Sequence, residues 1–338
     1  MKLVVFGTSE FAVPALERLA ERHEIVAVVT QPDRPAGRGH KLVATPVKRA
    51  AEARGVPVLT PEKLRPFTGE LRALGADAFV VASYGKIVPQ MLLDAVPIAF
   101  NVHPSLLPLY RGATPLQSAI RDGRDETGVT IIAMDAGMDT GDVLLQERTP
   151  IGPEETYGEL HDRLARRGAE LVLDAVDAYA NGTLTRTPQS ELARERGITE
   201  DEIARTLTRP LRKEDLAIDW YRPARAVVDQ IRSLAPQPLA RARCLDETVK
   251  VIAAHAVSSD EFERTVGGMV TTVPRSLTAA AAHPSRAPLV YGTADDGAVI
   301  VDRLIAPNRG PMSGEAFARS VYDRAGVDPN AELDGRLS

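Results

Sequence analysis

The sequence predicts an α/β fold, in which a Rossmann-like, parallel-rich sheet wrapped by helices is followed by an OB-like β-barrel domain. Three observations support this prediction. Strand-like and helix-like segments alternate through the first 180 residues, as in a parallel sheet with crossover helices. A polar segment without periodicity then interrupts the chain. Short strand-like runs separated by turn residues follow it, and these are typical of small β-barrels.

The first part of the chain contains the elements expected of such a sheet. Short apolar runs bounded by turn residues predict strands at residues 3–6, 25–29, 56–59, 78–82, 98–102, 129–134 and 143–146. Helical spacing occurs at 11–21, 45–54, 114–122 and 156–180. The last of these is the strongest, because Leu160, Leu164, Val172 and Ala175 form an apolar stripe.

Three regions follow from this pattern: a first domain over residues 1–180, a linker over 181–204 and a C-terminal domain over 205–338. Gly182, Pro188 and several threonines make the linker polar. The C-terminal elements expected are a helix at 222–234 and strands at 240–245, 249–254, 268–273, 288–291 and 298–305. The Ala-rich stretch within 275–286 is either a loop or a short helix.

Composition limits the class of protein. A chain of 338 residues favours two domains, although one large domain is possible, and the net charge of −5 argues against a protein that coats nucleic acid by bulk attraction. The single cysteine, Cys244, excludes an internal disulfide and a thiolate metal cluster. No apolar run approaches the roughly 18 residues that span a bilayer. We therefore expect a cytoplasmic, metal-free monomer without membrane contact.

Two nucleotide-binding motifs are missing. The turn at residues 6–12 lacks the three-glycine fingerprint of dinucleotide-binding proteins, and no Walker loop is present. A nicotinamide or flavin dinucleotide is therefore not expected, and neither is ATP hydrolysis.

Polar residues gather at the end of the strand predicted at 98–102. Asn101 and His103 are two residues apart and project from the same face of an extended chain, and Asp139 lies in a glycine-rich turn further along. An amide donor, an imidazole and a carboxylate are the groups needed to polarise a carbonyl that an amine attacks. Taken alone, the same residues also fit a strand cap, an edge histidine and a turn-forming aspartate.

The longer motifs around these residues resemble one family. Residues 101–115 (NVHPSLLPLYRGATP), 127–130 (TGVT) and 138–142 (MDTGD) are similar to the signature of the folate-dependent formyltransferases. Residues 30–39 (TQPDRPAGRG) resemble a loop of the members that formylate initiator methionyl-tRNA. The similarity is dense to about residue 180 and thins afterwards, where Pro210 and Gln237 depart from the family's pattern.

The resemblance implies a reaction and the residues for it. The formyl donor is 10-formyltetrahydrofolate, and the acceptor is the α-amine of methionine on its initiator tRNA. Asn101 donates to the formyl oxygen and His103 stabilises the oxyanion, with the imidazolium as one alternative. Asp139 holds that charge state and, through a water, helps to remove the proton of the amine.

Two further sets of residues follow from the resemblance. The folate site is expected at Ser105, Leu106, Leu107 and Pro108, closed by Gly85 and Ile87, although paired leucines are often plain core residues. The tRNA contacts expected are Arg34, Arg38 and Lys41, within the basic stretch 34–51. A solvated loop is the alternative for this stretch.

Two other functions compete. The chain could be another folate-dependent formyltransferase or a 10-formyltetrahydrofolate hydrolase, because the same three residue types serve those enzymes. It could also be an RNA-binding module that lost the chemistry. The basic loop and the second domain favour tRNA over a small acceptor, and the intact Asn101, His103 and Asp139 favour an enzyme.

Overall fold

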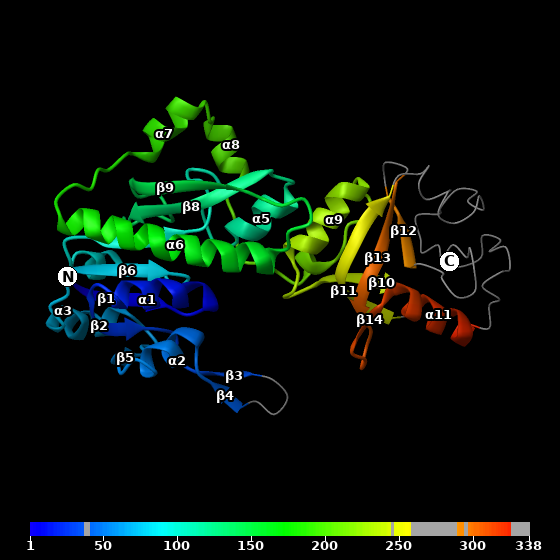
Figure 1. Cartoon of the computed structure of the whole chain (residues 1–338), viewed down its shortest axis with the longest axis horizontal. Coiled ribbons are helices and arrows are strands. Elements are labelled where there is room, and N and C mark those ends of the chain that lie inside the picture. The colour runs from blue at the N-terminus through cyan, green and yellow to red at the C-terminus, as the bar shows by residue number, and fades with distance from the viewer. Residues whose placement is uncertain (37–40, 245–246, 258–288, 294–296, 326–338) are drawn as a thin grey trace. The chain divides into compact units, whose positions relative to one another are not determined.

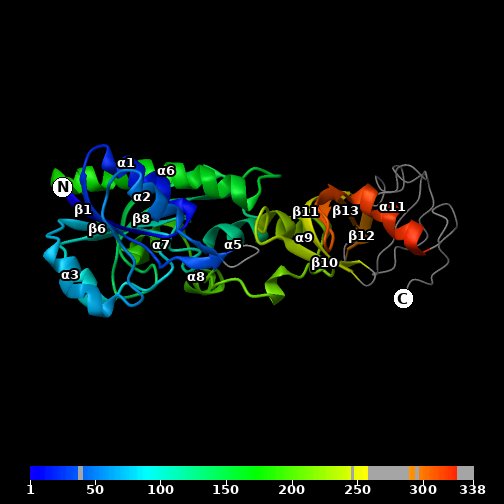
Figure 2. The ribbon, with the colours of Figure 1, turned by 90° about the horizontal axis from the view of Figure 1, so that it is seen from below.

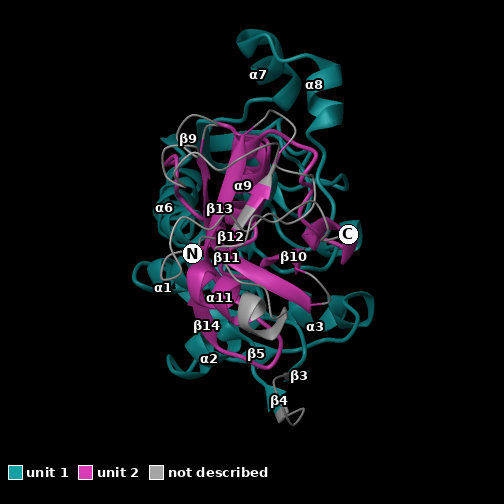
Figure 3. Cartoon of the chain, turned by 90° about the vertical axis from the view of Figure 1, so that its right-hand side faces the viewer, with its two compact units in different colours: residues 1–119, 125–151, 159–210 teal, residues 120–124, 152–158, 211–338 magenta. Residues whose placement is uncertain are grey.

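The computed structural model describes residues 1–36, 41–244, 247–257, 289–293 and 297–325. By their contacts the residues form two compact units, coloured separately in Figure 3. The first contains residues 1–119, 125–151 and 159–210, and the second contains 120–124, 152–158 and 211–338. The strand predicted at 268–273 and the Ala-rich stretch lie outside the described residues.

The first unit is built on a seven-stranded sheet in the order β5-β2-β1-β6-β7-β8-β9. Strands β6, β8 and β9 of this sheet can be followed in Figure 1. The strands from β5 to β7 are parallel, whereas β8 is antiparallel to β7 and β9 is antiparallel to β8. Their bounds are β1 Lys2–Gly7, β2 Glu24–Val29, β5 Val58–Leu59, β6 Ala78–Ala82, β7 Ala99–His103, β8 Glu126–Ala133 and β9 Val143–Pro150. The predicted parallel-rich α/β sheet is confirmed.

Helices cover both faces of this sheet (Figure 2). They are α1 Val13–Ala20, α2 Pro46–Glu52, α3 Thr68–Ala73, α4 Gln90–Leu93, α5 Pro115–Arg121 and α6 Tyr157–Ala180. Helix α6 packs closely on β7 because Gly168 has no side chain, and a Cβ there would lie 2.7 Å from Val102 Cγ1. Side chains alternate along a strand, so Asn101 and His103 project from the other face of β7.

One segment differs from its predicted form. Residues 181–204 were expected to be a polar linker, yet the structure forms α7 Gln189–Arg196 and α8 Glu200–Arg205 within the first unit. Thr187 pairs with Val143 at the start of β9 through two hydrogen bonds of 2.9 Å. The turn residues of this segment therefore separate short helices that pack on the first unit.

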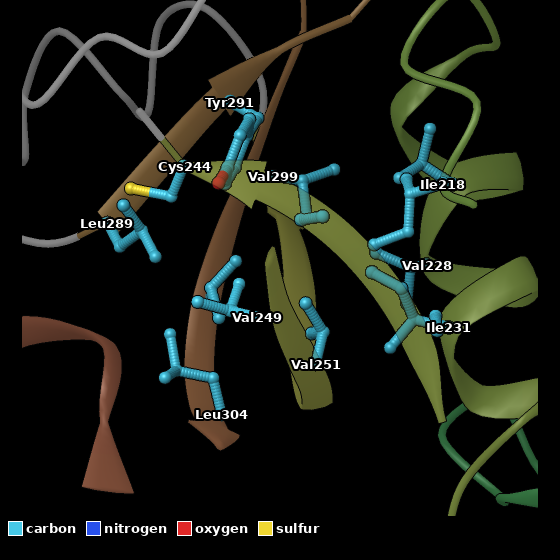
Figure 4. Packing of buried hydrophobic residues seen from close by; sticks show 14 of the residues in the cluster. Ile218, Val228, Ile231, Cys244, Val249, Val251, Leu289, Tyr291, Val299 and Leu304 are labelled. Carbon is cyan, nitrogen blue, oxygen red and sulfur yellow. The ribbon is translucent and has the colours of Figure 1, made fainter. Parts of the chain in front are cut away.

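The second unit is an antiparallel sheet with helices against it. Its strands follow the order β10-β11-β13-β12, with β14 on β13. The bounds are β10 Ala240–Cys244, β11 Glu247–Val257, β12 Leu289–Gly292, β13 Ala298–Ile305 and β14 Pro311–Ser313, with helices α9 Ala224–Ser233 and α11 Gly314–Ala325. Figure 4 shows Val228 and Ile231 of α9 in the core with Val249, Val251 and Val299. The predicted domain of antiparallel strands is confirmed, and its OB-type closure stays a prediction.

A buried ion pair stabilises the second unit. Arg232 Nε lies 2.7 Å from Asp229 Oδ1, and both side chains are about 95 % buried, with 6 % and 5 % exposed. Arg232 also donates to the main-chain oxygens of Gly152 and Glu155 at 3.2 and 2.9 Å. The pair thus connects α9 to residues that precede α6 in the sequence.

Arg232→Met is expected to lower the free energy of unfolding by about 3 kcal/mol, because it removes the buried partner of Asp229. Urea unfolding measures the change. Arg225→Met is the matched control, since Arg225 lies 3.2 Å from the same Asp229 oxygen but is 54 % exposed. It should cost less than about 1 kcal/mol, and equal losses in the two variants would contradict the role given to burial.

Candidate active site

The structure brings Asn101, His103 and Asp139 together. The first two lie on β7, and Asp139 comes from the loop between β8 and β9. Asn101 Nδ2 donates to Asp139 Oδ1 at 3.3 Å, and His103 Nδ1 lies 3.6 Å from Asp139 Oδ2. These groups sit at the carboxyl end of a parallel strand, where open α/β sheets bind their ligands.

The Asp139 carboxylate is the centre of this group. Besides Asn101, it accepts a hydrogen bond from the main-chain N–H of Gly112, 2.8 Å from Oδ2. The aspartate side chain is 18 % exposed and its backbone is left-handed, with φ +56°. An aspartate tolerates this conformation better than most residues, but at a cost that the surrounding contacts must offset.

The contacts of His103 determine its tautomer. Nε2 lies 2.9 Å from the main-chain oxygen of Tyr110, and because a carbonyl only accepts, Nε2 carries a proton. A second proton on the ring can only be at Nδ1, the atom that faces Asp139. The His103 side chain is 4 % exposed, so the ring is held in this orientation.

Asn101 has a donor left for a ligand. One N–H of its amide goes to Asp139, and within the described part of the chain no protein acceptor takes the other. The side chain is partly exposed. A carbonyl oxygen placed here would accept a hydrogen bond from Asn101 beside the Nδ1 of His103, so the residues fit the formyl end of the donor.

The segment Ser105 to Pro108 is held by Thr130, which belongs to the motif 127–130, and by Gln146, and neither residue has a role predicted from the sequence. Thr130 Oγ1 donates to Ser105 O at 2.6 Å and accepts from Leu107 N at 3.3 Å. Gln146 Nε2 donates to Thr130 Oγ1 and to Leu107 O. His103, Thr130 and Gln146 are register partners on β7, β8 and β9, a signal visible only once the strands are paired.

The two leucines of this segment differ in burial. Leu107 is fully buried and packs with Ile132 and Val143 in a small core cluster, with Leu192 against it. Leu106 is partly exposed, whereas Ser105 and Pro108 are buried. Leu107 therefore anchors the segment to the sheet, and Leu106 is the leucine that a ligand could contact.

The loop after β6 is the second part of the expected folate site. Gly85 has φ +74°, which suits glycine, and the Ile87 side chain is 83 % exposed. Tyr84 beside them is buried, and burial raises the pKa of its hydroxyl to about 12. Thr8 and Gln31 both donate to the main-chain oxygen of Tyr84, at 2.8 and 2.9 Å, so the start of this loop is fixed to its neighbours.

The expected tRNA contacts lie around a small hairpin of β3 Arg34–Ala36 and β4 Lys41–Val43. Arg34 is exposed and donates to Gln31 Oε1 at 2.7 Å. Lys41 begins β4. Arg38 lies outside the described residues.

Two features are absent from the described residues. No group of three or more His, Cys, Asp or Glu side chains there could hold a metal ion. Within the same residues, no helix combines the length and the apolar character needed to cross a bilayer.

Comparison with known families assigns the class. Residues 1–176 match the family described as Formyl transferase, and residues 210–322 match the Formyl transferase, C-terminal domain. The chain therefore belongs to the formyl transferase family, as its motifs predicted.

The names of individual relatives specify an activity within this family. The chain is 43 % identical over 324 residues to the methionyl-tRNA formyltransferase of Gluconobacter oxydans, covering 94 % of this chain and 96 % of that protein. It is 41 % identical to the methionyl-tRNA formyltransferase of Stutzerimonas stutzeri, covering 92 % of each. The fold is shared with an N-formyltransferase of Helicobacter canadensis, solved with folinic acid and dTDP-3-aminofucose. That structure has a TM-score of 0.61 and 18 % identity, covering 89 % of this chain and 98 % of the other.

Proposed function

We propose that Asn101, His103 and Asp139 form the catalytic group of this chain. The enzyme transfers the formyl group of 10-formyltetrahydrofolate to the α-amine of methionine on initiator tRNA. The relatives' activity gives the acceptor and the family gives the donor. The observation that supports the catalytic group is the Asp139 carboxylate, which binds the Asn101 amide and faces His103 Nδ1.

Asn101 binds the reacting carbonyl in this proposal. Its second Nδ2–H donates to the formyl oxygen, where negative charge grows as the amine attacks. A donor fixed in place before the reaction stabilises that charge without reorganising. The hydrogen bond to Asp139 fixes the amide, and it makes the nitrogen rather than the oxygen of Asn101 face the carboxylate.

His103 stabilises the negative charge of the oxyanion, and His103 and Asp139 together transfer the protons of the reaction. Protonated at Nδ1, His103 donates to the growing oxyanion, with the Asp139 charge next to that nitrogen. Asp139 takes the proton of the attacking amine through a water. The amine forms a C–N bond to the formyl carbon and gives the oxyanion, and the bond to the folate nitrogen breaks when the C=O bond re-forms. His103 gives that leaving nitrogen its proton and regains one from Asp139.

The folate and tRNA contacts belong to the same proposal. Ser105 to Pro108, with Gly85 and Ile87, bind the folate, and Arg34, Arg38 and Lys41 bind the acceptor tRNA. The C-terminal domain is proposed to be an OB-like barrel that binds the same RNA. We further propose that the enzyme is cytoplasmic, because charged tRNA is made in that compartment, and that it is a monomer.

Formyl transfer to charged initiator tRNA, compared with transfer to small amines, tests the acceptor. A strong preference for the charged tRNA is expected. Equal transfer to small amines would favour another folate-dependent formyltransferase. Hydrolysis of the donor without transfer to any amine would favour a 10-formyltetrahydrofolate hydrolase.

Arg38→Ala is expected to raise KM for tRNA, because a cation that contacts phosphate is lost. The salt dependence of binding should weaken by about one unit of slope. Arg54→Ala is the control, since Arg54 is exposed and its guanidinium lies 2.9 Å from the carboxylate of Glu17 on α1. Unchanged KM in Arg38→Ala across a salt titration would remove this residue from tRNA binding.

A further inference from the structure

We propose that Gln189 is a positioning residue for Asp139, an inference that rests on the catalytic assignment of Asp139. Gln189 is the first residue of α7, and it is 4 % exposed. Its Nε2 donates to the main-chain oxygens of Asp139 and Gly141, both at 2.8 Å. One amide group therefore holds the backbone on both sides of Thr140.

The orientation of the Gln189 amide is determined by its partners. Its Oε1 accepts from Arg111 Nε at 3.0 Å and from Arg111 Nη2 at 2.8 Å. An arginine can only donate and the two carbonyls can only accept, so the oxygen must face Arg111 and the nitrogen must face the loop. All the donors and acceptors in this chain of contacts are matched.

The loop between β8 and β9 has a strained and closely packed backbone that such contacts stabilise. Asp139 has a left-handed backbone, which is unfavourable for a residue with a side chain. Two residues on, a Cβ at Gly141 would lie 1.8 Å from Ala133 O, so the chain passes very close to the end of β8. Gln189 satisfies two carbonyls of this tight turn and thereby fixes where the Asp139 carboxylate points.

Thr208, which follows α8, supports Gly112, the residue whose N–H binds the Asp139 carboxylate. Thr208 donates to Arg111 O through both N and Oγ1, at 2.8 and 3.0 Å. The next residue, Gly112, donates its N–H to Asp139 Oδ2. Gln189 and Thr208 therefore support the two sides of the contact between Asp139 and Gly112.

Packing keeps α7 in place for this role. Leu192, three residues after Gln189, packs on the cluster of Leu107, Ile132 and Val143. Because i and i+3 lie on one face of a helix, Gln189 and Leu192 share the side of α7 that faces the loop between β8 and β9, which contains Asp139.

Two variants test the proposal. Gln189→Glu keeps the size and an acceptor for Arg111, but it sets a carboxylate oxygen against the carbonyls of Asp139 and Gly141. Gln189→Ala removes all four contacts. Both should lower kcat by about 10²-fold, the effect of a displacement of about 1 Å in a catalytic group, with KM for folate and tRNA within about threefold and an altered pH profile of kcat.

Thr206→Val is the matched control. Thr206 is the buried C-cap residue that follows α8, and its hydroxyl donates back to that helix, to Glu202 O and Ile203 O. It should lower the melting temperature without changing kcat or the pH profile. If the Gln189 variants lose rate only in proportion to their unfolded fraction, with an unchanged pH profile, the proposal is overturned.

A crystal structure of Gln189→Glu separates this proposal from the proposed function. Positioning predicts that Asp139 Oδ2 moves beyond hydrogen-bond distance, about 3.5 Å, from Gly112 N. An unmoved Asp139 would overturn the positioning role even if wild-type transfer is normal. Failure of the wild-type chain to formylate charged tRNA would overturn the proposed function, and the crystal structure would still decide the role of Gln189.

Discussion

Asp139→Asn is expected to lower kcat by about 10³-fold. The substitution removes the negative charge beside His103 Nδ1 and the group that accepts the amine's proton. It also breaks the donor and acceptor pattern, because Asn101 Nδ2 and Gly112 N both donate to this side chain. An asparagine presents only one oxygen to these two donors, so either orientation sets its NH₂ group against an N–H. Steady-state kinetics with charged tRNA measures the loss.

Asp135→Asn is the matched control for this loop. Asp135 is exposed, and its carboxylate accepts from Gly137 N and Thr140 Oγ1 in a local turn. Its neutral amide can keep an acceptor for these donors, so kcat should stay within about threefold of wild type. Comparable losses in the two variants would show that the loop responds to any change of charge, and would contradict a specific role for Asp139.

The periodicity of the sequence was enough to predict the sheet and the place of Asn101 and His103. The strand expected at 98–102 is β7 Ala99–His103, so His103 is the last residue of the strand. The alternation of side chains still sets both polar residues on one face, since that argument depends on their separation and not on the strand's bounds. Asp139 was found only through the resemblance of its motif.

Long-range polar partners could not be predicted. Thr130 and Gln146 act through cross-strand register, and register depends on pairings between distant segments. Gln189 is 50 residues after Asp139, in a polar stretch whose glycines, threonines and proline predicted a linker. Two helices as short as α7 and α8 leave little periodicity, and tertiary contacts such as that of Leu192 stabilise them instead.

His103→Gln is expected to lower kcat by about 10²- to 10³-fold, the loss seen when one donor to a growing oxyanion is removed. Glutamine can still donate to Tyr110 O, the contact that Nε2 makes at 2.9 Å, but it has no second nitrogen to carry a proton opposite Asp139. Because the lost interaction arises only in the transition state, kcat and kcat/KM should fall together. Affinity for tRNA, measured by filter binding, should stay within about threefold.

His161→Gln is the control for replacing a histidine with glutamine. His161 lies on α6, where its ring packs in a T-shaped arrangement with that of Phe11, and its side chain is 16 % exposed. Its replacement should leave kcat unchanged, which separates the chemistry of His103 from the general cost of losing an imidazole. Normal turnover by His103→Gln would mean that hydrogen bonding to Tyr110 is the whole function of this residue. Asn101 and Asp139 would then have to stabilise the transition state without it.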